Sequence, residues 1–311
     1  MIDLATLVSP LSVEDFFEQH WPDKPYSSSS DEKRLERLRE ITELDSAEAA
    51  LSKARAIKVF RPDGEMAIVP DGRAALPLYK LGLTCYLGSK HIPALRQSRE
   101  QLAADLGLPA GSVDCEVFCS SGDSGAWMHS DYDVNFALLL SGTKRWRLAP
   151  NEHIRNQTTM CVPSTRKAPD QLQLELADVQ PFPERMPDDA LEIDVEAGGL
   201  VFMPRGWWHE TEASGDCLQV NFVVQGPMWQ AVLTRALKDR LVRDPDWRAY
   251  AFDLYGPPER RDAALDEFAR LLAGLRGQLE DLISAEDHRA LAERLVEDSG
   301  YLPAKAAVEA K

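Results

Sequence analysis

The sequence predicts a mainly β protein with α additions. We expect a double-stranded β-helix, or jelly roll, between a mixed α/β N-terminal region and C-terminal helices. Between residues 113 and 226, short runs of β-branched and aromatic residues alternate with Gly, Pro and Asp. After Pro227 the apolar residues recur at helical spacing. The chain has 311 residues, 44% of them hydrophobic, which suffices for one large β domain with additions or for two domains.

Residues 1–112 are expected to be mixed and to pack on the core. The run from Val13 to Trp21 has the apolar rhythm of a short helix, and Ser12 precedes it as a suitable cap. The elements expected in this region are helices at 13–21, 32–55 and 92–106 and a strand at 56–60, with a polar loop at 27–30.

Residues 113–227 are expected to form the jelly-roll core. The candidate strands are 115–121, 127–140, 144–149, 191–195, 199–203, 207–213 and 217–225. The polar, proline-containing stretch 151–189 is predicted to be a long insertion, of the kind that forms lids or substrate grooves.

Residues 228–311 are predicted to be a helical region. Its Leu and Ala stripes fall at 229–243, 259–282 and 284–297. We expect these helices to serve as a homodimer contact, as a winged-helix-like appendage, or as a cap over the edge strands of the barrel.

The charge balance limits the partners that the protein can have. The chain carries 35 Lys and Arg against 51 Asp and Glu, a formal net charge of −16. Such a surface repels phosphate backbones, so direct nucleic-acid binding is not expected. A basic protein partner suits it, although acidity alone also keeps a cytosolic protein soluble.

Three features that the sequence lacks predict the cellular compartment of the protein. No apolar run is long enough for a membrane helix. The N-terminal residues lack the basic start of a secretory signal. The 5 cysteines are scattered and odd in number, which argues against a disulfide scaffold. We therefore expect a cytoplasmic protein.

The sharpest local feature is His129-Ser130-Asp131. Residues two apart on a strand point to the same side, so the imidazole and the carboxylate face together. On its own this spacing is common, and a surface hydrogen-bonded pair is the alternative interpretation. Asp133 lies on the same strand face and could replace Asp131 as a ligand.

A second histidine strengthens the interpretation. His209 follows a Gly turn, a buried apolar strand and the turn Pro204-Arg205-Gly206. In a jelly roll, strands remote in sequence lie side by side, so His209 can join His129 and Asp131. Two histidines and one carboxylate form the facial triad of non-haem Fe(II) oxygenases. Lys144 opens a neighbouring strand and could bind the distal carboxylate of a dicarboxylate co-substrate.

Together these segments resemble the JmjC-type (cupin-like) Fe(II)/2-oxoglutarate-dependent oxygenases, in the branch of factor inhibiting HIF and the ribosomal oxygenases. The residues that carry the resemblance are His129-Ser130-Asp131, Asn135-Phe136, Gly142-Thr143-Lys144-Arg145-Trp146, Pro204-Arg205-Gly206-Trp207-Trp208-His209 and Val220-Asn221-Phe222. The resemblance implies a hydroxylase that uses Fe(II), 2-oxoglutarate and O2 and acts on a protein or peptide side chain.

The resemblance also assigns roles to individual residues. His129, Asp131 and His209 correspond to the iron ligands, and Lys144 to the residue that holds the C5 carboxylate of 2-oxoglutarate. Asn135 and Asn221 match polar positions that line the co-substrate pocket.

The sequence departs from this pattern at three positions. Ala126 replaces a hydroxyl residue that contacts 2-oxoglutarate, and Leu139 and Ser141 replace residues that are polar or acidic in the ribosomal oxygenases. Either Tyr79 or Tyr86 would supply the pocket's aromatic hydroxyl.

Three other functions remain open at this point. The substrate could be a small molecule or natural product if the insertion seals the cavity. The chain could be a non-catalytic cupin-like binding protein. A cupin isomerase with Zn or Mn is the third alternative, because divalent ions share these ligands.

Overall fold

The computed structural model describes residues 1–60, 66–163, 166–169, 171–283 and 288–298. Contacts divide the chain into two compact units, Met1–Gln225 and Gly226–Lys311. Within the described residues, no helix is both long and apolar enough to cross a membrane.

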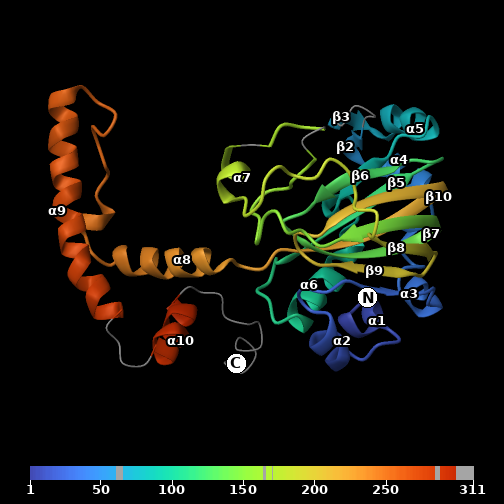
Figure 1. The fold of residues 1–311 in the computed structure, drawn as a ribbon, viewed down its shortest axis with the longest axis horizontal. Helices are drawn as coiled ribbons and strands as arrows, with labels where there is room; N and C mark the ends of the chain where they lie inside the picture. Colours follow the sequence, from blue (N-terminus) through green and yellow to red (C-terminus); the bar gives the residue numbers. More distant parts are fainter. Residues whose placement is uncertain (61–65, 164–165, 170, 284–287, 299–311) are drawn as a thin grey trace. The chain divides into compact units, whose positions relative to one another are not determined.

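In the first unit, the described strands join in one sheet with the order β1-β9-β7-β10-β5-β4-β2-β3, while β6 pairs with β10 and β8 with β7 (Figure 1). The strands are β1 (Tyr26–Ser28), β2 (Arg55–Phe60), β3 (Met66–Asp71), β4 (Cys85–Gly88), β5 (Val113–Ser120), β6 (Gly125–Ser130), β7 (Val134–Ala149), β8 (Leu191–Glu196), β9 (Leu200–Met203) and β10 (Trp208–Val224).

Two long strands, β7 and β10, turn this sheet into a jelly roll. The first half of β7 pairs with β9 and the second half with β8. The first half of β10 pairs with β6 and the second half with β5. Each strand therefore belongs to both layers, and the predicted fold class is confirmed.

The crossing of β7 from one layer to the other depends on Gly142. Its φ is +84°, and a Cβ there would lie 2.4 Å from the Asp216 carbonyl oxygen and 2.5 Å from Cys217 Sγ. Only glycine fits this conformation and this space. The sequence predicts two strands joined by a turn at this point, whereas the structure shows one bent strand.

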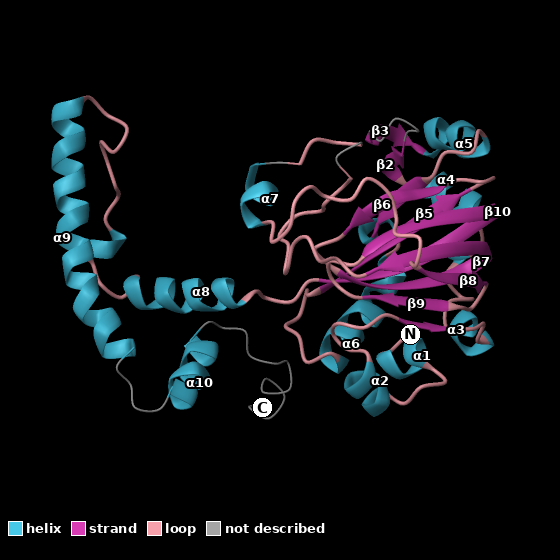
Figure 2. Cartoon of the chain, in the orientation of Figure 1, coloured by secondary structure: helices cyan, strands magenta, loops and turns pink. Residues whose placement is uncertain are grey.

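The helices of the first unit are short and lie mainly in its N-terminal part (Figure 2). They are α1 (Leu4–Val8), α2 (Val13–Gln19), α3 (Glu32–Glu36), α4 (Ala47–Lys53), α5 (Gly72–Lys80), α6 (Arg96–Asp105) and α7 (Gln171–Leu176), with 3-10 turns at Thr42–Leu44, Ser89–His91 and Pro93–Leu95. Ser12 caps α2 as predicted, since its hydroxyl accepts from the Asp15 N–H.

Several element predictions were wrong. The helix expected at 32–55 is divided into α3, a 3-10 turn and α4. The loop expected at 27–30 overlaps the end of β1, which pairs with β9 and so extends the sheet. The candidate strand 127–140 is interrupted after Ser130, and the bend there carries Asp131.

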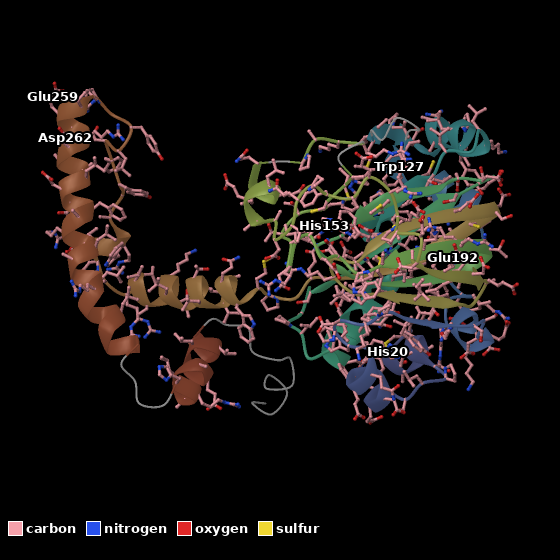
Figure 3. The ribbon with its side chains drawn as sticks, in the orientation of Figure 1. His20, Trp127, His153, Glu192, Glu259 and Asp262 are labelled. Carbon is pink, nitrogen blue, oxygen red and sulfur yellow. The ribbon has the colours of Figure 1, made fainter. Side chains whose placement is uncertain are left out.

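Three apolar clusters hold the first unit together. The largest joins the N-terminal helices to the outer face of β5, β7, β9 and β10. A second fills the barrel interior around Leu139, Trp146 and Val201. A third, around Trp208 and Phe182, attaches the insertion to β6 and β10. There, His153 of the insertion (Figure 3) meets both rings edge-on.

The second unit consists of α8 (Trp229–Leu241), a 3-10 turn (Asp246–Arg248), α9 (Pro258–Ile283) and α10 (His288–Asp298). The helices expected at 229–243 and 259–282 correspond to α8 and α9. The start of the helix expected at 284–297 lies outside the described residues, and α10 covers all of the remainder.

Candidate metal and co-substrate site

The structure brings His129, Asp131 and His209 together. His129 on β6 lies directly opposite His209 on β10, and their ring centroids are 4.0 Å apart. The Asp131 carboxylate approaches Nε2 of His129 at 3.8 Å and Nε2 of His209 at 3.6 Å. One donor atom from each residue lies within 4.8 Å of the others, a spacing that one metal ion can bridge.

Both imidazoles are oriented by their own backbone. Nδ1 of His129 lies 2.6 Å from the Trp127 carbonyl oxygen, and Nδ1 of His209 lies 3.1 Å from that of Trp207. Because Nδ1 donates its proton to these carbonyls, the lone pair of each ring is on Nε2, which faces the cluster. Burial lowers the pKa of His209 to about 3, so this ring is neutral, as metal binding requires.

The side-chain amides of Asn135 and Asn221 hold the Asp131 carboxylate, the third donor, through two successive hydrogen bonds. Asn135 Nδ2 donates to Asp131 Oδ2 at 3.3 Å, and Asn221 Nδ2 donates to Asn135 Oδ1 at 3.0 Å. The structure thus places Asn135 and Asn221 behind the carboxylate, and Asn135 contacts it directly. The sequence resemblance did not indicate this positioning contact.

Lys144 lies in the barrel interior and is 6% exposed. Its Nζ donates to Gln219 Oε1 at 3.0 Å and lies 5.9 Å from the ring centroid of Phe118 and 5.6 Å from that of Trp146. Burial lowers its pKa to about 8. No ion pair of the described residues includes Lys144, so a buried cation is available for an anion.

Sequence reasoning missed Gln219. The signal was its position two residues before Asn221 on the same strand, because alternate residues of a strand share a face. Thr211 was also missed. It is two residues after His209, and its hydroxyl accepts from the Ala126 N–H at 3.0 Å. A hydroxyl therefore lies beside Ala126, the position at which the family pattern has one.

The structure separates the remaining candidates. Asp133 is not part of the donor cluster, and burial, followed by the nearby charge of Asp131, raises its pKa to about 6. Tyr79 belongs to the outer apolar core, where its hydroxyl donates to Asp216. Tyr86 packs on Phe118 at a centroid distance of 5.3 Å, so it lies on the interior side. Leu139 is buried in the interior cluster.

A groove of about 600 Å³ runs between β6 and the insertion. Its walls include Trp127 and Thr211, each two residues from a histidine of the cluster. Arg166 of the insertion lies 5.6 Å above the Trp127 ring centroid, and Figure 3 shows Trp127 at this edge of the barrel. The insertion therefore forms one wall of a groove beside the site.

A jelly roll with two imidazoles, one carboxylate and a buried ammonium group in its interior defines a class of protein. The side chains fit a ferrous ion, since nitrogen and carboxylate donors in this ratio are its usual ligands. Lys144 fits an anionic co-substrate beside it. The class is that of the metal-dependent oxygenases with a facial triad.

Comparison with known proteins gives the family. The "Cupin-like domain" family matches residues 27–224, which is more than half of the chain. The chain therefore belongs to this cupin-like family, and the predicted resemblance to the JmjC-type, Fe(II)/2-oxoglutarate-dependent oxygenases is confirmed.

Individual relatives are distant. The chain is 26% identical to "Uncharacterized protein YxbC" of Bacillus subtilis over 302 residues, 92% of this chain and 87% of that protein. It is 23% identical over 256 residues to the "Bifunctional lysine-specific demethylase and histidyl-hydroxylase NO66" of Drosophila persimilis, 78% of this chain and 34% of that protein. The chain thus spans about a third of the NO66 protein.

Among solved structures, the Escherichia coli ribosomal oxygenase YcfD in complex with cobalt and 2-oxoglutarate is 17% identical, with a TM-score of 0.45. The match covers 85% of this chain and 67% of that one. Another structure of E. coli YcfD has a TM-score of 0.48 at 16% identity and covers 84% of this chain and 68% of that one.

Proposed function

We propose that this protein uses Fe(II), 2-oxoglutarate and O2 to hydroxylate a side chain of a protein or peptide. The observation that supports this most strongly is the convergence of His129, Asp131 and His209 in a barrel that also holds the buried Lys144. When bound, the iron and its co-substrates supply the oxidising power that replaces a C–H by a C–OH bond, and 2-oxoglutarate leaves as succinate and CO2.

The chain's own residues bind, orient and exclude water. His129, Asp131 and His209 would hold the metal, with its remaining positions open to 2-oxoglutarate and O2. Lys144 would bind the distal carboxylate, and its loss of hydration on burial strengthens that contact. Asn135 fixes the Asp131 carboxylate, so the donor set is preorganised.

The groove beside β6 supports a peptide substrate. It is open between the strand and the insertion, and its walls carry both signs of charge, including Arg145, Arg166 and Glu212. The relatives named as ribosomal oxygenase and histidyl-hydroxylase point to a protein side chain as well. The basic character of the partner and a cytoplasmic location remain parts of this proposal. The 5 cysteines are all buried, which suits a reducing compartment.

The test uses lysate from a strain that lacks the gene, because its proteins are unmodified. The lysate is incubated with purified protein, Fe(II), 2-oxoglutarate and air, and peptides that gain one oxygen atom are identified by mass spectrometry. We expect one or a few such peptides with the intact protein and none with Asp131→Ala. Oxidation of low-molecular-weight metabolites alone would instead assign a small-molecule substrate. Absence of any succinate production would refute the proposal.

A further inference from the structure

Glu116 on β5 is a largely buried acid to which the proposed chemistry gives no role. It lies directly opposite Asn221 on β10 and Gly88 on β4. Phe118 is two residues later on the same face, and its ring centroid lies 5.9 Å from Lys144 Nζ. Alternate residues of a strand share a face. The Glu116 carboxylate is therefore on the interior face of the barrel, the face that carries the co-substrate residue.

The carboxylate of Glu116 has unused acceptor capacity. Tyr86 Oη donates to Glu116 Oε1 at 2.6 Å, while an ionised carboxylate accepts about four hydrogen bonds. No ion pair among the described residues includes Glu116. Lys58 on β2 is the register partner of Tyr86, and its Nζ lies 4.7 Å from the Tyr86 ring centroid. Burial, the main cause, raises the pKa of Glu116 to about 7, although the hydrogen bond from Tyr86 and the charge of Lys58 act in the opposite direction.

Space and a second acceptor adjoin this carboxylate. Gly88 has no side chain, and a Cβ built there would meet nothing within 4 Å. Asn221 is 7% exposed, and its Oδ1 is buried with no donor among the described residues. Its Nδ2 is used by Asn135. The Glu116 carboxylate and Asn221 Oδ1 are therefore two acceptors on neighbouring strands beside open space. A bound group that satisfies both must carry hydrogen-bond donors.

Lys144 and Glu116 carry opposite charges inside the same barrel. Phe118 packs next to both Lys144 and Tyr86. Lys144 is a buried cation without an anion, which the co-substrate supplies. Glu116 is a largely buried carboxylate without an ion-pair partner among the described residues, and a cationic substrate group could supply that partner. We propose that Glu116, with Asn221 Oδ1, receives the cationic end of a basic substrate side chain, either guanidinium or ammonium. This inference rests on the proposed function and adds the substrate class.

The test is a binding selection with defined peptides. Pools of nonapeptides with randomised flanks carry Arg, Lys, citrulline or norleucine at the centre. Citrulline keeps the shape of arginine without its charge, and norleucine keeps the stem of lysine. The peptides are passed over immobilised protein saturated with Mn(II) and N-oxalylglycine, and the retained fraction is quantified by mass spectrometry. We expect Arg or Lys pools to be retained at least about ten-fold over both neutral pools, the factor expected of a charge-assisted hydrogen bond. The favoured pool distinguishes guanidinium from ammonium.

Three variants assign the preference to this residue. Glu116→Gln should reduce the selectivity to within about two-fold, and Glu116→Asp should keep part of it. Glu192→Gln removes an exposed acid on β8 (Figure 3) and should leave it unchanged. Equal retention of all four pools by the unaltered protein, or full selectivity in Glu116→Gln, would overturn the inference. Binding of Mn(II) and N-oxalylglycine to the same samples is measured separately, so failure of the proposed function is recognised by its own signal.

Discussion

Two aspartates two residues apart illustrate how position decides chemistry at the residue scale. Asp131 approaches both imidazoles and is held by Asn135, whereas Asp133 has a buried Oδ1 without a partner among the described residues. The sequence spacing left either residue possible as a ligand. We predict that Asp131→Asn weakens Mn(II) binding at least about 100-fold, since an anionic ligand is lost. Asp133→Asn should change it less than about three-fold, and calorimetry measures both. Comparable losses in the two variants would contradict this assignment.

Lys144 gives a second prediction. Lys144→Met replaces the buried ammonium group by an apolar chain of similar length. We expect it to weaken binding of 2-oxoglutarate to the Mn(II)-loaded protein by about 1.5–3 kcal/mol, the contribution of a hydrogen bond to a charged group. Thermal stability should be kept or raised, because an unpaired buried charge is removed. An unchanged 2-oxoglutarate affinity in calorimetry would exclude this role for Lys144.

Glu116 gives a prediction on stability and pH. Its folded pKa of about 7 lies above the ordinary value of 4.5. Folding therefore disfavours the ionised form, and the cost is absent below pH ~4.5, grows as pH rises and is complete above pH ~7. The stability of Glu116→Gln relative to that of the unaltered protein should accordingly rise by about 1–3 kcal/mol from pH 5 to pH 8. Urea unfolding at the two pH values measures this, with Glu192→Gln as control. A pH-independent difference would contradict the raised pKa.

At the scale of elements, strongly periodic segments were predictable and short ones were not. The jelly-roll strands carry their own signal of β-branched and aromatic residues between turn residues. In contrast, β1 is a three-residue strand of polar sequence, and only pairing with β9 makes it extended. The meeting of His129 and Asp131 could be anticipated from their spacing, although Asp131 lies just beyond the end of β6. The relay from Asn221 to Asp131 could not, because it depends on register between strands remote in sequence.

Arg34 shows how an element of low intrinsic preference is held in place. The side chain of this residue, in the middle of α3, is completely buried. It donates to carbonyl oxygens of the N-terminal segment and of the turn before β9, and to one hydroxyl: Thr6, Ser9, Ser29, Gly198 and Ser28 Oγ. It thereby ties β1 and α1 to the barrel.

Arg34→Leu should therefore destabilise the first unit. Buried carbonyls lose their donors, at a cost of about 3–5 kcal/mol in the free energy of unfolding. Arg37→Leu, an exposed position of the same segment, should change it by less than about 0.5 kcal/mol. Chemical denaturation followed by tryptophan fluorescence measures both. Equal stabilities of the two variants would show that the hydrogen bonds of Arg34 are not needed for the fold.

At the scale of the whole molecule, the two compact units differ in how their apolar residues are used. In the first, buried side chains form continuous clusters around the barrel. In the second, several aromatic residues are exposed, among them Trp229 at 84%, Tyr250 at 84% and Phe252 at 73%. Large apolar side chains in such density are typical of a surface that another protein covers.

The helix α8 makes the expected homodimer testable. Its inner face carries the buried residues Val232 and Ala236, while Trp229 and Leu233, four residues apart, share an exposed face. We predict a homodimer in sedimentation velocity at micromolar concentration. Substituting both exposed residues by Glu should give a monomer, because two charges at the contact oppose its desolvation.

The substitution should not affect the first unit, so Mn(II) binding and the cooperative unfolding of the barrel are the controls. A single change on the opposite side of the same helix, Lys238→Glu, alters the charge by the same amount without removing apolar surface. If that change dissociates the dimer equally, net charge rather than the Trp229 and Leu233 face governs association. If the unaltered protein sediments as a monomer, the dimer prediction is wrong, and these side chains are left for a different partner.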